Sequence, residues 1–386
     1  MTDSAEPKHL MSMDVLKGII LTVIVFGHML VNERTTNVAG LAAEQSSGGM
    51  PIIVQALYLG LMAFFILSGY FYRPKRTFKE NMIKRLKQIG IPFVLAGVLL
   101  PLITYLYLLA CGYNLPIDDY FTAAQHGLGI YNAFAPNGTP YVAAYSTVTY
   151  GAYFLAAMLW GFLFFYALAP RVLDDYKKVL VSIIVLLAIE FILVQYCPIK
   201  LPLYFKMGPI AAAFMMVGAC LAKVGFLENV EYGNKRELKY WLIPIVFFAA
   251  GFTMCYFLPP NIMFDQYYYG SYGTWSLFPY FIESVLMFIP IAYIGFIFSK
   301  IPLISKVFDL FGKHTMGTIL IHPVIAKMLV APFYMVSAYV LVPNEVPMEY
   351  RLFIAVMSLV IPVLICHFGP KIIEKIKGAR GSPQES

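Results

Sequence analysis

The sequence predicts an all-α integral membrane protein with about ten transmembrane helices, both termini in the cytoplasm and a single membrane domain. Hydrophobic residues make up 60% of the 386 residues and charged residues only 13%, against about 25% charged residues in soluble domains. Apolar stretches of about 18 residues or more recur along the whole chain, and each is long enough to cross about 30 Å of hydrocarbon. The basic residues are concentrated in the segments between these stretches.

The predicted membrane spans follow one another with short or aromatic connections. They cover residues 13–31, 51–71, 91–111, 148–169, 179–197, 207–224, 241–258, 277–299, 314–337 and 351–369. Residues 13–370 are therefore expected to form the membrane domain, between cytoplasmic tails of residues 1–12 and 371–386. The composition after Lys377 predicts disorder at the C-terminal end.

The distribution of Lys and Arg tests this arrangement. With loops alternating between the two sides, 23 of the 28 Lys and Arg residues fall on one side, and Lys327 lies inside the ninth span. The other side holds only Arg34, Lys200, Lys206 and Arg351. Cytoplasmic loops carry such an excess of Lys and Arg, so both termini are expected in the cytoplasm. This distribution also explains the net charge of +7 without a nucleic-acid partner.

The loops differ in composition between the two sides. The most basic inner loop contains seven cations, namely Arg73, Lys75, Arg76, Lys79, Lys84, Arg85 and Lys87. This cluster would suit the phosphates of a cytosolic donor or an anionic lipid. Two long outer segments, 112–147 and 259–276, are rich in aromatic residues, which suits either an interfacial belt or stacking on sugar rings. The five cysteines lie singly, and a Cys111–Cys197 bridge on the outer side remains open.

Two ionisable residues share one face of the first span. Lys17 and His28 are eleven residues apart, which places them about 20° from alignment and about 16 Å apart along a helix. Asp14 lies three residues before Lys17 and is placed to pair with it. Such side chains cost about 2.5–3.5 kcal/mol each in a membrane. Lys17 suits either snorkelling or ligand binding, and His28 either helix packing or general-base catalysis.

Other ionisable residues lie inside later spans. Glu283 is predicted at about the depth of His28, where a carboxylate would orient the imidazole or bind a sugar hydroxyl. His322 precedes Pro323 in the ninth span, which suits either a packed histidine at a kink or a functional one. Glu190 and Lys327 have no partner that the sequence identifies. No HExxH, GxSxG or phosphate-binding glycine motif is present, and no metal site is expected.

Four motifs occur in order along the chain. They are MDVLKG at 13–18 leading to Gly27-His28, FFILSGY at 64–70, KRLK at 84–87 leading to Ile91-Pro92, and FGKHTMG at 311–317 leading to LIHP at 320–323. Together they resemble the acyltransferase-3 family of ten-helix membrane O-acyltransferases. The chain departs from the family pattern in having Lys17 where arginine is common, and in lacking the soluble hydrolase-like domain of some members.

The resemblance implies transfer of an acyl group, with acetyl the expected one, from cytosolic acyl-CoA to a hydroxyl of a carbohydrate-type acceptor at the outer side of the cell membrane. From the residues themselves we expect His28, with Glu283 as its orienting group, to act in catalysis. We expect Lys17, Arg73, Lys84 and Arg85 to bind the donor, and Asp14, Ser68 and His322 to line the substrate passage. At position 17, lysine keeps the charge of arginine but cannot bind phosphate in the bidentate manner of arginine.

Two other classes of function fit the same features. A transporter or flippase of a lipid-linked glycan would also use ten spans, buried ionisable residues and outer aromatic residues. Secondary transporters usually show paired internal repeats, and the sequence shows none. A non-catalytic partner of a polysaccharide synthase would not need Lys17 and His28 on one face. Transfer of label from acyl-CoA to a membrane product separates these alternatives.

Overall fold

A computed structural model describes residues 10–30, 62–74, 76–130, 152–197, 201–258, 273–334, 342 and 345–380. Within these ranges the chain forms helices and no strand, which confirms the all-α fold class. The helices are α1 (Met11–Leu30), α3 (Ala63–Tyr70), α4 (Phe78–Arg85), a π-helical turn (Leu86–Gly90), α5 (Ile91–Ala110), α6 (Ile117–Gly127), α7 (Ala152–Val172), α8 (Tyr176–Tyr196), a 3₁₀ segment (Pro202–Met207), α9 (Gly208–Lys223), α10 (Phe226–Tyr232), α11 (Leu238–Phe257), a 3₁₀ turn (Gly273–Ser276), α12 (Leu277–Ser299), α13 (Pro302–Lys313), α14 (Thr315–Val330) and α15 (Met348–Arg380).

Eight of the described helical segments are long and apolar enough to cross a membrane. They coincide with eight of the ten predicted spans. The ninth, α14, is apolar but covers only Thr315–Val330, and it ends before the predicted limit at residue 337. Of the second, predicted at 51–71, the structure describes the end that contains α3 and leaves 51–61 outside the described residues. The total of ten therefore stays a prediction.

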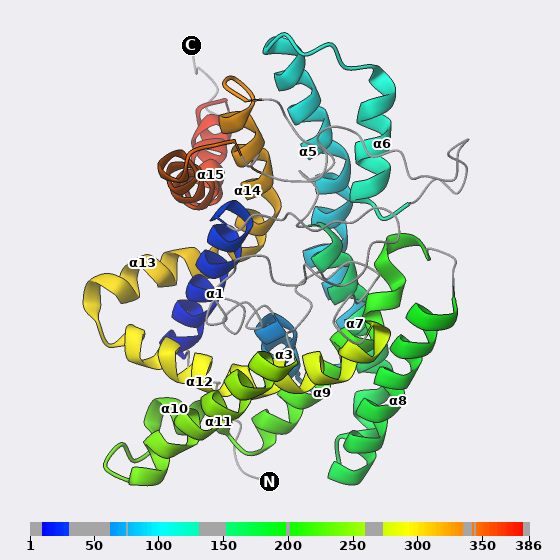
Figure 1. Cartoon of the computed structure of the whole chain (residues 1–386), viewed down its shortest axis with the longest axis vertical. Coiled ribbons are helices and arrows are strands. Elements are labelled where there is room, and N and C mark those ends of the chain that lie inside the picture. The colour runs from blue at the N-terminus through cyan, green and yellow to red at the C-terminus, as the bar shows by residue number, and fades with distance from the viewer. Residues whose placement is uncertain are drawn as a thin grey trace, which may run out of the picture.

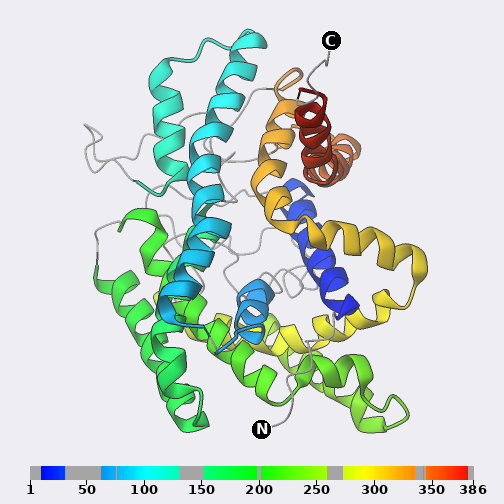
Figure 2. The ribbon, with the colours of Figure 1, turned by 180° about the vertical axis from the view of Figure 1, so that it is seen from behind.

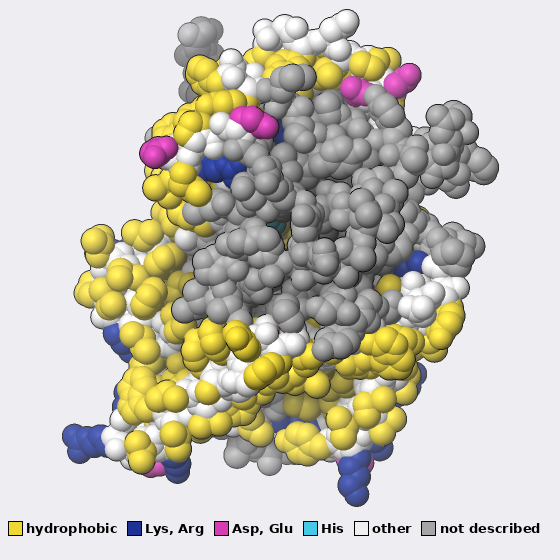
Figure 3. Space-filling view, viewed as in Figure 1, with side chains coloured by type: hydrophobic (Ala, Val, Ile, Leu, Met, Phe, Trp, Pro, Cys, Tyr) yellow, Lys and Arg dark blue, Asp and Glu magenta, His cyan; other side chains and the backbone are white. Residues whose placement is uncertain are grey.

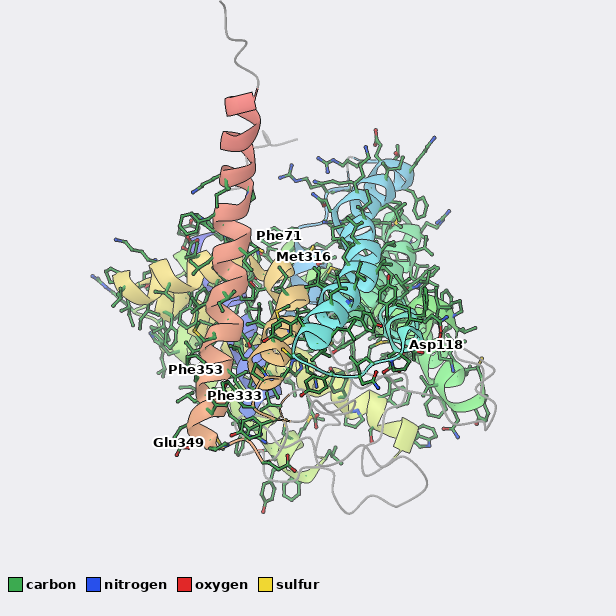
Figure 4. The ribbon with its side chains drawn as sticks, turned by 90° about the horizontal axis from the view of Figure 1, so that it is seen from above. Phe71, Asp118, Met316, Phe333, Glu349 and Phe353 are labelled. Carbon is green, nitrogen blue, oxygen red and sulfur yellow. The ribbon has the colours of Figure 1, made fainter. Side chains whose placement is uncertain are left out.

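Residues that are expected on opposite sides of the membrane lie toward opposite edges of the structure. Asp118 and Glu349, from segments expected outside, and Phe333, near the expected outer end of the ninth span, lie toward one edge in Figure 4. Phe71 and Met316, at expected cytoplasmic ends of their spans, lie farther toward the opposite edge. This separation agrees with the predicted alternation of loops, and the cytoplasmic location of the termini remains a prediction.

Helix α1 is enclosed by the C-terminal part of the chain. It packs against α12, α13, α14 and α15, and Figures 1 and 2 show it beside α13 and α14. A second group joins α3, α7 and α8 to α9, and α5 connects the groups through contacts with α7 and α14. Hydrophobic side chains cover much of the rim in Figure 3, as expected of a surface in contact with lipid.

Close contact between α1 and α13 depends on two glycines. A Cβ atom at Gly18 would lie 2.1 Å from the carbonyl oxygen of Phe308, and one at Gly312 would lie 1.8 Å from that of Asp14. Larger residues would push the two backbones apart, and small residues at helix contacts are typical of membrane proteins. The first motif of the sequence is thus packed directly against the fourth.

Buried charged side chains make hydrogen bonds to backbone groups at the C-terminal end of α8 and the N-terminal end of α9. Glu190 of α8 accepts a hydrogen bond from the backbone N–H of Ile210 in the first turn of α9. Lys206 donates to the carbonyl of Cys197, the C-cap residue of α8. Both contacts match the charge preferred at that helix end. Lys206 was expected only to lie on the outer side, and the sequence did not indicate that it is buried.

Two further expectations change. Helix α15 runs as one helix through Arg380, so the first part of the predicted 371–386 tail is helical and the disorder expected from residue 378 is wrong for 378–380. Cys111 and Cys197 are not joined by a disulfide, so the bridge left open by the sequence is not formed.

Candidate functional site

The packing of α1 against α14 brings two histidines together. Nδ1 of His28 lies 3.1 Å from Nε2 of His322. The two rings are stacked, with centroids 5.4 Å apart and an angle of 13° between their planes. The side chain of His322 is fully buried, and that of His28 is half-buried. The sequence placed both residues in the membrane but gave no sign that they are partners.

The hydrogen bonds define which nitrogen of each ring carries the proton. Nδ1 of His322 lies 3.1 Å from the carbonyl oxygen of Thr318, which can only accept, so this nitrogen is the donor. In a neutral His322 the Nε2 atom is then an acceptor, and it receives the Nδ1–H of His28. A neutral His28 therefore carries its basic lone pair on Nε2. The chain of contacts orients His28 as a base.

The backbone of α14 supports this arrangement. His322 contacts the carbonyl of Thr318, four residues earlier in its own helix. The next residue, Pro323, lies inside α14 and has no N–H, so the carbonyl of Ile319 loses its usual helical partner. One turn of α14 therefore contains both an imidazole that is held by a backbone carbonyl and a carbonyl that lacks its helical hydrogen bond.

Arg351 is a cation close to the end of α1 that carries His28. From the sequence it was expected only to lie in an outer loop. It is buried, with Nε 3.0 Å from the carbonyl oxygen of Val346 and Nη1 3.5 Å from that of Met29. Met29 follows His28 at the C-terminal end of α1, where a cation is favourable. Arg351 therefore connects the start of α15 to the end of α1. No signal in the sequence identified this contact.

At the other end of α1, the predicted ion pair is present. Nζ of Lys17 lies 2.9 Å from Oδ1 of Asp14, and their side chains are 31% and 13% exposed. The backbone of Asp14 is the part of α1 that meets Gly312. Lys17 is thus held at the junction of α1 and α13, with part of its charge balanced by Asp14.

Glu283 does not take the role predicted beside His28. Its carboxylate is fully buried, and neither oxygen has a hydrogen-bond partner in the part of the chain that the structure describes. His322, not Glu283, contacts Nδ1 of His28. The sequence placed Glu283 at a suitable depth but could not determine which helix face meets α1. Its two buried acceptor oxygens remain available for a hydroxyl donor.

Ser68 has a local structural contact. Its hydroxyl donates to the carbonyl of Phe64 in the preceding turn, at 2.7 Å. The adjacent Gly69 lies where a Cβ atom would be 1.9 Å from the carbonyl oxygen of Met215. The second motif is therefore explained in part by close packing of α3 on α9, and the passage role of Ser68 stays a prediction.

The predicted donor-binding cations differ in their surroundings. Nε of Arg85 donates to the hydroxyl of Tyr166 at 3.0 Å, and its guanidinium lies 4.2 Å from the ring centroid of Phe162. Arg73 and Lys84 are exposed. Arg85 is thus oriented by α7, whereas the side chains of the other two are accessible to an anion.

A second histidine pair connects α15 to the turn between α13 and α14. Nζ of Lys371 lies 3.1 Å from Nε2 of His367, and Nδ1 of His367 lies 3.1 Å from Nε2 of His314. Lysine only donates, so the chain runs from Lys371 through His367 to His314. Burial lowers the pKa of His314, and the nearby His367, Lys313 and Lys371 lower it further.

Among the residues that the structure describes, no group of three or more His, Cys, Asp or Glu side chains is arranged to hold a metal ion.

Comparison with known proteins identifies the family. The chain matches the acyltransferase-3 family, described as an acyltransferase domain, over residues 11–367. No curated protein and no solved structure gives a significant match. The family match includes all four motifs and both histidines of the buried pair. The chain therefore belongs to the acyltransferase-3 family of membrane acyltransferases.

Proposed function

We propose that the protein moves an acyl group, acetyl in the simplest case, from cytosolic acyl-CoA to a hydroxyl of a carbohydrate-type acceptor at the outer side of the cell membrane. The observation that carries this proposal is the chain from the Thr318 carbonyl through His322 to His28, which leaves the basic lone pair of His28 on Nε2. Family membership supports the transferase class over the transporter alternative.

In the proposed reaction His28 acts as the general base. Nε2 of His28 takes the proton of the acceptor hydroxyl while the hydroxyl oxygen attacks the thioester carbonyl carbon. The carbon–sulfur bond then breaks, the ester remains on the acceptor, and the CoA thiolate takes the proton back from His28. His322 accepts a hydrogen bond from Nδ1–H throughout, which holds the ring and stabilises the imidazolium.

A covalent route would use the same nitrogen. Nε2 of His28 would attack the thioester carbonyl carbon and carry the acyl group, while CoA leaves as its thiolate. The acceptor hydroxyl oxygen would then displace His28 from the acyl group and pass its proton to the CoA thiolate. Both routes need His322 to accept from Nδ1. Rapid quench of the reaction without acceptor separates them, because only the covalent route gives labelled protein.

The donor is proposed to approach from the cytoplasmic end of α1. Lys17 lies near that end, about 16 Å along the helix axis from His28, and Arg73, Lys84 and Arg85 would contact the phosphates of CoA. Asp14 keeps Lys17 in place through the 2.9 Å ion pair. The thioester would then reach His28 through the region that Ser68 and His322 border. Residues 13–370 would form this catalytic domain, with cytoplasmic tails on both sides.

Glu283 is proposed to bind a hydroxyl of the acceptor. Its fully buried oxygens have no hydrogen-bond partner among the described residues, and a carboxylate that receives hydroxyl donors recovers part of the cost of burial. Replacement with glutamine should raise KM for the acceptor and leave KM for acyl-CoA unchanged.

The experiment uses the purified protein in liposomes with radiolabelled acetyl-CoA, with and without candidate glycans. Wild type should transfer label to a glycan product, and His28→Ala should not, although it is produced and folded. His367→Ala is the matched control, because it also removes one member of a histidine pair, and it should retain transfer. Label in no product for wild type and His28→Ala alike would contradict the proposed function.

A further inference from the structure

An apolar groove runs along the outside of the helix bundle between α5 and α7. Its volume is about 570 Å³, within the range of pockets that hold small ligands. Its two walls include Leu86, Ile91, Val94 and Leu95 on the α5 side and Leu159 and Trp160 on the α7 side. Nothing in the proposed acyl transfer uses this groove.

The groove has a closed floor and an open, apolar side. Phe93 and Ala156 beneath it are buried. Ile91 and Val94 at its edge are 55% and 50% exposed, although they belong to a candidate membrane span. Apolar side chains in that position face lipid chains in a membrane, so the groove opens to the bilayer and not to water.

One cation lies among the residues that line the groove. Lys87 is exposed and comes from the π-helical turn that precedes α5. Within the described ranges it has no hydrogen bond or ion pair. The nearby Arg85 is engaged by Tyr166, and the carboxylate of Glu80 by Thr77. Lys87 therefore has a positive charge that no described carboxylate balances.

We propose that this groove binds one anionic phospholipid of the cytoplasmic leaflet, with an acyl chain between α5 and α7 and the phosphate on Lys87. The dimensions fit: from Lys87 to Leu95 a helix rises about 12 Å, close to the roughly 15 Å that one leaflet contributes to the hydrocarbon core. The charge fits as well, because anionic headgroups are attracted to Lys and Arg at the cytoplasmic surface.

A bound lipid would fill the space between α5 and α7 and so stabilise their packing. Because it binds the folded bundle, the lipid should raise the stability by RT ln(1 + L/Kd) for one site, where L is the free lipid concentration, so the unfolding temperature should increase with lipid concentration. The binding does not depend on acyl transfer, so it can be measured without substrates.

The test uses delipidated protein in detergent, titrated with phosphatidylglycerol or phosphatidylcholine and followed by native mass spectrometry and thermal unfolding. Wild type should retain one phosphatidylglycerol at least fivefold more strongly than phosphatidylcholine. Lys87→Gln should remove this preference, and Val94→Trp, which fills the groove, should reduce retention of both lipids. Lys306→Gln is the matched control, because Lys306 is an exposed lysine of α13 outside the groove.

The outcomes separate the alternatives. Equal retention of the two lipids by wild type, or an unchanged preference in Lys87→Gln, would overturn the proposal. Competition by glycerol 3-phosphate at millimolar concentration would also overturn it, because it would identify a site for a free phosphate and not for a lipid. Circular dichroism and gel filtration of each variant would verify that the bundle is folded before its lipid retention is compared.

Discussion

Nδ1 of His28 lies 3.1 Å from Nε2 of His322, although 294 residues separate the two in the sequence. The second ring nitrogen of His322 contacts a backbone carbonyl that can only accept. The pair is therefore directional, and its basic end is on His28. This relationship makes His322 a positioning residue whose replacement has a specific expected effect.

Replacing His322 with alanine removes the acceptor for Nδ1–H of His28, so its ring loses orientation. We expect kcat to fall by about 100-fold or more, the usual contribution of a positioned general base, with KM for acyl-CoA unchanged. His322→Gln retains an acceptor oxygen and should recover part of the rate. Steady-state kinetics in liposomes measure both values. Equal losses in the two variants would indicate a packing role only.

Lys17 should act through its charge at the cytoplasmic end of α1. Lys17→Ala should raise KM for acyl-CoA at least tenfold, because a cation beside the donor phosphates is lost. Lys17→Arg should retain much of the binding, since the charge remains. Titration with CoA measures the affinity directly. If both variants bind CoA as wild type does, Lys17 only snorkels to the headgroups.

Arg351 should fix the position of the C-terminal end of α1 relative to the start of α15. Arg351→Met removes the donors to the carbonyls of Val346 and Met29 and should lower stability by about 1.5–3 kcal/mol, the typical value for hydrogen bonds to a charged group. Because His28 is next to Met29, kcat should fall as well. Arg351→Lys should restore part of both. Thermal unfolding and kinetics on the same preparations decide the matter, and a Tm equal to that of wild type would exclude this role.

The pair of His314 and His367 should make stability depend on pH. The pKa of His314 is lowered below 6.5 in the folded protein, so the unfolded chain binds more protons around pH 6 and stability rises with pH there. The stability that comes from a neutral His314 should be fully present above pH 6.5. It should be lost as the pH falls toward the pKa of His314 in the folded protein. Thermal unfolding from pH 5 to 7.5 tests this, and His314→Gln should show a weaker dependence. A variant with the wild-type slope would contradict the assignment.

Much of the architecture could be predicted because it depends on properties of single segments. Length and hydropathy locate a membrane span without reference to its neighbours, and eight predicted spans agree with the structure. The spacing of Asp14 and Lys17 also predicts their ion pair, since residues three apart meet on one helix. The order of four short motifs indicated the family, which the match over residues 11–367 confirms.

The partners of buried polar residues could not be predicted in the same way. Helical periodicity tells which residues share a face, but not which other helix meets that face. Glu283 was therefore expected beside His28, where the structure places His322. Arg85 was expected to bind the donor, and the sequence did not indicate that Tyr166 orients it. Glu190 had no assigned partner, and it caps α9.

By itself the sequence determined that this protein crosses the membrane many times, that its basic loops share one side, and that Lys17 and His28 lie on one face of the first helix. Only the tertiary structure decided that His322 is the partner of His28 and that Lys87 borders an apolar groove. The physical reason is that burial in lipid is a property of each segment, whereas a hydrogen bond between helices depends on how two of them pack. That packing is determined by close contacts such as those at Gly18 and Gly312.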